Sequence, residues 1–218
     1  MWQYARFSVM QPAKLSDVNR AMRKVYLSYR DGQEQYVEDL ARVLGEAVVQ
    51  GHIVSKVNAP TERQRMERIR HEILKDSEVT IYLIGEGGCN FGKDAVRFQK
   101  RELQASLFDG EGINRNGLLG VVLPEMYDKI FKNDQPCDVC GENHVALHVF
   151  DDVVLHEFFY NYFLPLPAHH DHWADDDRFC ELVAWDEFVK APEQFVEMAY
   201  AKTQSPVSHK VKWDIDIR

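Results

Sequence analysis

The stretch VTIYLIGEGGCNFGKDAVRFQKRE, residues 79–102, decides the fold. Its first seven residues, VTIYLIG, form an apolar run rich in β-branched and aromatic side chains, which predicts a buried strand. A glycine-rich loop follows, and Asp94 is then placed as the N-cap of a helix that continues to about Phe108. In an open α/β sheet, ligands bind outside the carboxyl ends of the strands. The stretch therefore predicts a strand, a loop at the ligand-binding edge, and a helix that carries Glu102.

The residues before this stretch repeat the alternation of strand and helix. KVYLSY, residues 24–29, predicts a strand, and residues 33–49 have the apolar spacing of an amphipathic helix. HIVSKV, residues 52–57, predicts a second, short strand. Thr61 is placed as the N-cap of a third segment, a highly charged helix over residues 62–76.

The residues after this stretch complete an α/β pattern. GLLGVVL, residues 117–123, and ELVAW, residues 181–185, are further apolar runs, and residues 186–201 predict the last helix. The predicted strands are continuously apolar, without alternating polar residues, and along the chain they take turns with helices. This pattern indicates a mainly parallel sheet covered on both faces. Residues 125–179 interrupt the rhythm and are interpreted as an insertion, and the alternation over residues 211–217 predicts an edge strand.

Composition limits the classes of protein. The chain of 218 residues fits one domain with additions: an N-terminal extension (1–23), a main domain (24–202) and a tail (203–218). A net charge of -9 argues against a broad nucleic-acid surface and against attraction to an anionic membrane. No run is as long and apolar as a membrane span, and the first residues lack the apolar core of a signal peptide. Four cysteines do not indicate a secreted disulfide framework, so we expect a cytoplasmic protein.

Three motifs in a fixed order resemble the TIR domain, and more closely its bacterial branch, to which the TIR component of Thoeris antiphage systems belongs. They are LSY at residues 27–29, VTIYLIG followed by a helix with Phe98-x-x-x-Glu102, and GLLGVVLP at residues 117–124. Residues 182–200 also look like the end of that branch's domain. NAD-cleaving TIR domains commonly have Trp where this chain has Phe98. The resemblance implies a flavodoxin-like three-layer TIR fold with an insertion before the last core strand.

The resemblance also implies a function, which is cleavage of the bond between nicotinamide and ribose in NAD⁺. Glu102 would be the catalytic carboxylate. The product would be an ADP-ribose-derived messenger, cyclic or conjugated, that activates a separate effector, and the enzyme would act as a homo-oligomer. NAD⁺ would be the substrate, with no cofactor required. The implied and inferred substrate-binding residues are Ser28, Tyr29, Arg30, Asn58, Cys89, Asn90 and Phe98. The alternative from another class is a non-catalytic TIR-like module for assembly or protein interaction.

Elementary chemistry is compatible with a single carboxylate. Nicotinamide leaves as a neutral molecule, so no general acid is required, and positive charge develops on the ribose as in glycoside cleavage. A carboxylate placed beside that ribose stabilises the charge. The sequence also leaves purely structural roles open for these residues. Glu102 would then be an exposed helix carboxylate, Phe98 a core residue, and Arg30 part of a surface ion pair with Asp31 or Glu34. The loop EGGCNFG matches neither a P-loop nor the G-x-G-x-x-G fingerprint.

Cysteines and histidines form two further patterns. Cys137 and Cys140, with His144 and His148, offer two thiolates and two imidazoles, which suit a tetrahedral Zn²⁺ site. The alternative is two free cysteines in a loop. A second group of histidines, in AHHDHW at residues 168–173, is interpreted as a polar surface loop. Cys180 is expected to be a small buried hydrophobe.

Overall fold

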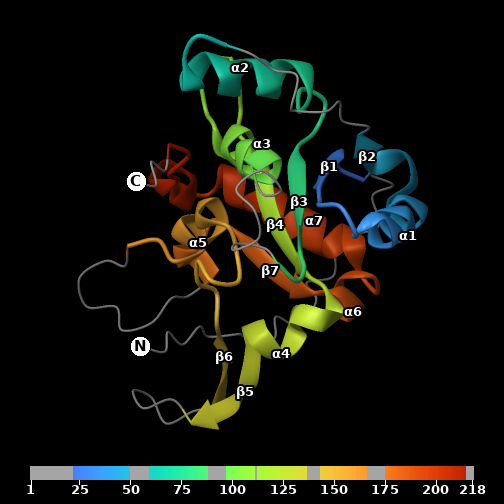
Figure 1. The fold of residues 1–218 in the computed structure, drawn as a ribbon. Coiled ribbons are helices and arrows are strands. Elements are labelled where there is room, and N and C mark those ends of the chain that lie inside the picture. Colours follow the sequence, from blue (N-terminus) through green and yellow to red (C-terminus); the bar gives the residue numbers. More distant parts are fainter. Residues whose placement is uncertain are drawn as a thin grey trace.

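The computed structural model describes residues 22–49, 59–87, 97–110, 112–136, 143–165 and 175–214. Its centre is a five-stranded parallel sheet in the order β2-β1-β3-β4-β7 (Figure 1). The strands are β1 (Val25–Ser28), β2 (Val48–Val49), β3 (Val79–Ile84), β4 (Gly117–Val122) and β7 (Glu181–Ala184). This is the flavodoxin-like strand order, in which the sheet grows first to one side of β1 and then to the other. The predicted α/β class with a parallel sheet is confirmed.

The three central strands are apolar because both of their faces are covered. Every residue of β1, β3 and β4 is buried. Val25 lies opposite Val79 across the β1–β3 pair, and Ser28 lies opposite Tyr82. Burial on both faces explains the unbroken apolar runs in the sequence.

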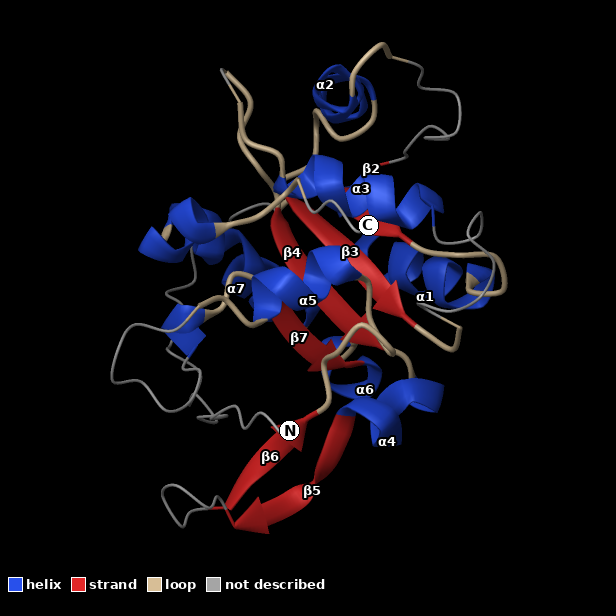
Figure 2. Ribbon diagram, turned by 60° about the vertical axis from the view of Figure 1, so that its left-hand side comes forward, coloured by secondary structure: helices blue, strands red, loops and turns tan. Residues whose placement is uncertain are grey.

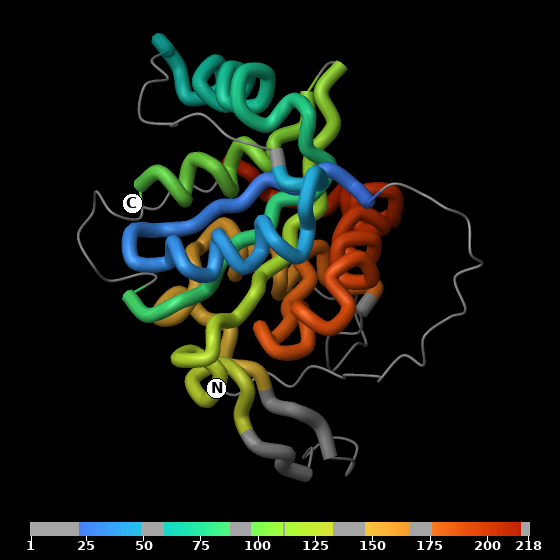
Figure 3. Tube along the Cα trace, turned by 90° about the vertical axis from the view of Figure 1, so that its right-hand side faces the viewer, coloured from blue at the N-terminus to red at the C-terminus, as the bar shows by residue number. Residues whose placement is uncertain are grey.

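One face of the sheet is covered by α1 (Glu34–Leu44), α6 (Trp185–Phe188) and α7 (Pro192–Gln204). Figure 3 shows α1 and α7 together on this side of the sheet. Leu40, Phe188 and Val196 from these helices pack against the side chains of Val25, Ile81 and their neighbours. The apolar stripe of α1 therefore faces the sheet, as its spacing predicts.

The opposite face is covered by α3 (Arg97–Leu107) and α5 (His156–Tyr162), and α2 (Glu62–Glu72) packs beside α3 (Figure 2). Leu103 and Phe158 pack against Tyr82 of β3. Met66 and Ile69 of α2 pack with Tyr26 of β1. Three layers result, and α5, which comes from residues 125–179, is part of one of them.

The described part of residues 125–179 also contains α4 (Tyr127–Ile130), an antiparallel hairpin of β5 (Phe131–Pro136) and β6 (Asn143–Leu147), and a short 3-10 helix at Asp175–Asp177. The hairpin is a separate two-stranded sheet that points away from the main sheet (Figures 1 and 2). None of the described helices is both long enough and apolar enough to cross a membrane.

Three predicted helices have different bounds, and the one predicted over residues 62–76 ends at Glu72. The helix predicted over residues 33–49 ends at Leu44, because Gly45 adopts a φ of 55° and turns the chain. Val48 and Val49 then pair with β1 as a strand, and residues 52–57 lie outside the described residues. The last helix is two helices, α6 and α7, and Pro192 stands in the first turn of the second.

The predicted edge strand near the C-terminus is wrong for the described residues 211–214, which form no strand. Trp213 instead packs edge-on against Phe108 at a centroid distance of 4.9 Å. Val211 and Trp213, the apolar residues of this alternation that the structure describes, are both partly buried against the core.

Candidate active site

Glu102 lies over β1, with its carboxylate between two hydroxyl groups. The Tyr26 hydroxyl donates to one carboxylate oxygen at 2.7 Å, and the Ser28 hydroxyl donates to the other, also at 2.7 Å. Tyr26 and Ser28 are two residues apart on one strand, so their side chains leave the same face of the sheet. The site thus joins α3 to β1, through the second and the last residue of that strand.

A buried chain of hydrogen bonds fixes the turn of α3 that carries Glu102. Ser106 Oγ donates to the backbone carbonyl of Glu102 at 2.7 Å and accepts from Thr80 Oγ1, also at 2.7 Å. The amide of Asn116 donates to Thr80 Oγ1 at 3.0 Å and to Ser77 Oγ at 2.8 Å. All four of these side chains are buried, so the position of Glu102 is set by β3 and by the residue that precedes β4, as well as by β1.

The electrostatic state of this carboxyl group is unusual for a glutamate. Burial raises the pKa of Glu102 to about 7, and the hydrogen bonds from Ser28 and Tyr26 oppose that shift without cancelling it. Burial, together with the charge of Glu102, raises the pKa of Tyr26. The tyrosine therefore remains a hydroxyl donor at neutral pH. The group is an acid poised to change charge near neutrality, a property often found at functional sites.

Arg30 lies at the adjoining edge of the sheet, where β1 and β3 end. Its guanidinium donates to the carbonyl of Gly87 at 2.7 Å and to that of Gly85 at 3.1 Å, and it also contacts the carbonyl of Glu86. These contacts are to backbone, and not to Asp31 or Glu34. The gap between β1 and β3 is the switch point of this strand order, where ligands bind in such folds. Arg30 therefore ties together the two sides of that gap.

The other predicted substrate-binding residues fall into two groups. Tyr29 and Phe98 are 43% and 38% exposed, so Phe98 is not a core residue. The remaining three, Asn58, Cys89 and Asn90, lie outside the described residues. The structure thus brings Glu102 together with Ser28, and places Tyr29 and Arg30 directly after Ser28.

Tyr26 is a site residue that sequence reasoning missed. It was assigned only to the first strand, although its hydroxyl contacts Glu102 as closely as that of Ser28 does. The available signal was the spacing of two hydroxyl side chains, Tyr26-x-Ser28, in an otherwise apolar strand. A buried hydroxyl requires a partner, and an acidic group on the covering helix provides one.

The predicted zinc ligands are only partly visible. Cys137 and Cys140 lie outside the described residues, and the side chain of His144 in β6 is likewise not described. His148 Nε2 lies 3.0 Å from both carboxylate oxygens of Asp152. In the described ranges, no three His, Cys, Asp or Glu side chains gather as a metal site would require. Cys180 is buried in the apolar core, as expected.

Comparison of the chain with known proteins gives no relative from which to transfer a role. No protein-family model, no curated protein and no solved structure matches it.

Proposed function

We propose that the chain is a TIR-type enzyme that cleaves NAD⁺ between nicotinamide and ribose, with Glu102 as the catalytic carboxylate. The observation that carries this proposal is the placement of Glu102 beside the switch point of the sheet, with its two oxygens bonded to Tyr26 and Ser28. An ordinary helix carboxylate would face water. The order of the LSY, Phe98-x-x-x-Glu102 and GLLGVVLP motifs resembles that of TIR domains, and this resemblance supports the proposed family.

The proposed reaction makes limited demands on the protein. The bond between C1′ of the ribose and the nicotinamide nitrogen breaks, and its electron pair stays with the nicotinamide, which leaves neutral. A carboxylate has about four acceptor positions, of which Tyr26 and Ser28 occupy two. The others are available to the ribose hydroxyls. The cationic nicotinamide ring favours the ionised form of Glu102, and the positive charge that develops on C1′ is stabilised by it.

The nucleophile that captures C1′ decides the product. Water gives ADP-ribose and a proton, whereas a nitrogen of the substrate's own adenine gives a cyclic product, and a second molecule gives a conjugate. In the proposed antiphage role the cyclic or conjugated product is a messenger that activates a separate effector. We also propose a homo-oligomer as the active form, as the family resemblance implies.

The test is incubation of the purified protein with NAD⁺, followed by mass spectrometry of the products. Glu102→Gln preserves the shape of the side chain and removes its charge. We expect this variant to lose at least about 100-fold in turnover, the size of effect seen when a transition-state electrostatic contact is removed. Glu38→Gln, which changes an exposed carboxylate on α1, is the matched control and keeps full turnover.

Two outcomes contradict the proposal. If Glu102→Gln folds and cleaves NAD⁺ at the wild-type rate, Glu102 is not the catalytic group. If the wild-type protein releases no nicotinamide at any protein concentration or state of assembly, the non-catalytic module becomes the better description. Circular dichroism of each variant separates loss of chemistry from loss of fold.

A further inference from the structure

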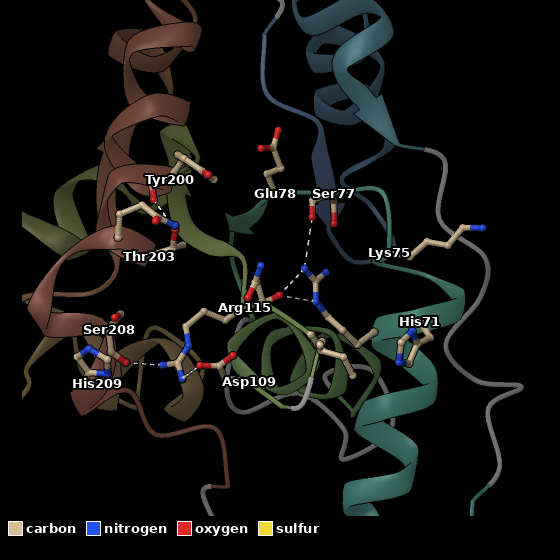
Figure 4. Close-up of a pocket in the computed structure, with 15 residues that line it drawn as sticks. His71, Lys75, Ser77, Glu78, Asp109, Arg115, Tyr200, Thr203, Ser208 and His209 are labelled. Atoms are coloured by element: carbon tan, nitrogen blue, oxygen red, sulfur yellow. Dashed lines mark hydrogen bonds and ion pairs between the residues drawn. The ribbon is translucent and has the colours of Figure 1, made fainter.

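A cavity of about 560 Å³ lies at the end of the sheet opposite to Glu102 (Figure 4). It is lined by the carboxyl-terminal end of α2, the segments that enter β3 and β4, and the end of α7 with the turn that follows it. Ser77 and Glu78 precede β3, and Arg115 precedes β4. The cavity is therefore at the amino ends of the strands, whereas Ser28, the partner of Glu102, is the last residue of β1.

A buried cation forms part of the cavity wall. Arg70 is only 7% exposed, and its guanidinium donates to the carbonyls of Asn114 at 2.7 Å, Leu74 at 2.7 Å and Ser77 at 3.4 Å. No carboxylate in the described part of the chain pairs with it. Burial lowers the pKa of Arg70 to about 10, so it is still charged at neutral pH. Buried charges in proteins are normally paired, and this one has no counter-charge among the residues that the structure describes.

The two acidic side chains that line the cavity both form ion pairs with other residues. Asp109 pairs with Arg115 at 2.9 Å, and Glu78 pairs at 2.7 Å with Arg23, which also pairs with Glu197 at 2.9 Å. Neither is available to Arg70. The acidic residues of the cavity wall therefore do not balance the positive charge of Arg70, although the chain as a whole carries a net charge of -9.

Further basic side chains surround the opening. Lys75 is exposed and makes no hydrogen bond or ion pair with any residue that the structure describes. Figure 4 shows His71 and Lys75 on one side of the cavity and Ser208 and His209 on the other. The charge of Lys75 on one side and the ring N–H of His209 on the other fit a small anion held between them, and the volume lies within the range of small-molecule sites.

We propose that this cavity, the Arg70 cavity, binds a phosphate-bearing small molecule about the size of a nucleoside phosphate. Its phosphate oxygens provide the counter-charge that Arg70 lacks and contact Lys75 at the opening. Arginine and lysine are the side chains that most commonly bind phosphate. Because Nε, Nη1 and Nη2 of Arg70 already donate to carbonyls, Arg70 contributes mainly its charge, and Lys75 adds a second charge at the opening. The site is independent of NAD⁺ cleavage, because it shares no residue with the Glu102 site.

Isothermal titration calorimetry at low salt tests the proposal, with inorganic pyrophosphate and ADP as probes. Lys75→Glu and His209→Glu place a negative charge on opposite sides of the cavity, at exposed positions where folding is not at risk. We expect each to raise Kd about tenfold or more. Lys190→Glu reverses the charge of a lysine outside the cavity and leaves Kd unchanged. Added salt weakens binding to the wild type.

NMR signals of the His71 and His209 imidazoles locate the bound probe, and they shift on titration of the wild type. The proposal is overturned if neither probe binds below about 1 mM. It is equally overturned if Lys75→Glu and His209→Glu bind as tightly as Lys190→Glu, because the probe then binds elsewhere. Turnover of NAD⁺ is not a readout here, so failure of this site leaves the proposed enzyme activity standing.

Discussion

At the scale of single residues, Glu102 owes its character to two opposing effects. Burial makes its charged form costly, and the hydroxyls of Tyr26 and Ser28 stabilise that form. If either hydroxyl is removed, less remains to oppose the effect of burial, which raises the pKa of Glu102. The balance therefore predicts how each change moves the pKa of Glu102.

We expect Tyr26→Phe to raise the pKa of Glu102 further, by about one unit, because the variant loses a hydrogen bond to the ionised carboxylate. The measurement is a pH titration of the glutamate carboxyl carbons by NMR, with Glu102→Gln used to assign the resonance. Tyr160→Phe changes an exposed tyrosine and is the control. An unchanged or lowered pKa in Tyr26→Phe would show that the Tyr26 hydroxyl does not stabilise the ionised form of Glu102.

The same pKa predicts how stability depends on pH. The pKa of Glu102 is raised in the folded state, to about 7, above its ordinary value of 4.5, so the folded state holds its proton more tightly. The free energy of unfolding therefore falls as pH rises from about 4.5 to 7, and this contribution is constant above that range. Between pH 5 and 8, we expect the wild type to lose about 2 kcal/mol relative to Glu102→Gln.

Urea denaturation of both proteins at pH 5 and pH 8 measures this difference. Other titrating groups affect both proteins alike and cancel in the comparison. A difference between the two proteins that is the same at both pH values is the result that would contradict a raised pKa.

The roles of some site residues could be predicted from the sequence, and those of others could not. Glu102 was selected through a family resemblance, since a helix glutamate by itself is an ordinary surface residue. Tyr26 was missed because its partner lies far away in the chain, and a single sequence does not indicate which strand residue a helix residue meets. Arg30 was placed correctly at the end of β1, but its contacts with the carbonyls at residues 85–87 depend on the path of a loop.

At the scale of elements, the close approach of α5 to β4 depends on Gly120. A Cβ atom at this position would lie 2.6 Å from Cζ of Phe158 and 2.9 Å from Cδ1 of Ile84. We expect Gly120→Ala to lower the free energy of unfolding by about 2 kcal/mol, because the added methyl group overpacks a filled core.

Chemical denaturation of a double-mutant cycle measures this effect. In a Phe158→Leu background the ring is absent, so Gly120→Ala should cost clearly less than in the wild type. If both backgrounds give the same cost, α5 does not pack on β4 as described. The cycle also tests whether residues within 125–179 belong to the core of the main domain.

Elements were predicted well where one pattern dominated. The strand at residues 79–84 and the helix after Thr61 follow from an apolar run and from an N-cap whose side chain accepts from the amide of Gln64. The error near Val48 and Val49 arose because two apolar residues fit both the stripe of a helix and a short strand. The positive φ of Gly45 decides between them, and a sequence pattern shows the glycine but not its conformation.

At the scale of the whole molecule, the β5–β6 hairpin is an addition to a complete three-layer fold. Lys132 and Ala146 are paired across the two strands, so an Asn-Gly turn can join them in place of residues 133–145. We expect this shortened protein to keep its far-UV circular dichroism and to melt within a few degrees of the wild type. A loss of cooperative unfolding would show that the hairpin is required by the sheet.

The shortened protein also addresses the zinc prediction. It lacks Cys137, Cys140 and His144, while His148, with its Asp152 partner, is retained. If these residues bind zinc, metal analysis after dialysis finds zinc in the wild type and none in the shortened protein. Equal zinc content in the two proteins contradicts a site at these residues.

The strand order has a consequence for synthesis on the ribosome. β1 to β4 all precede residue 123, so four of the five strands of the sheet are available early, and they can pair before the rest of the chain has emerged. β7 pairs with β4 only after residues 181–184 have been made. Until then, one edge of β4 presents unpaired amide and carbonyl groups, the kind of template that promotes association between nascent chains. A chaperone requirement should therefore be greatest for fragments that end between β4 and β7.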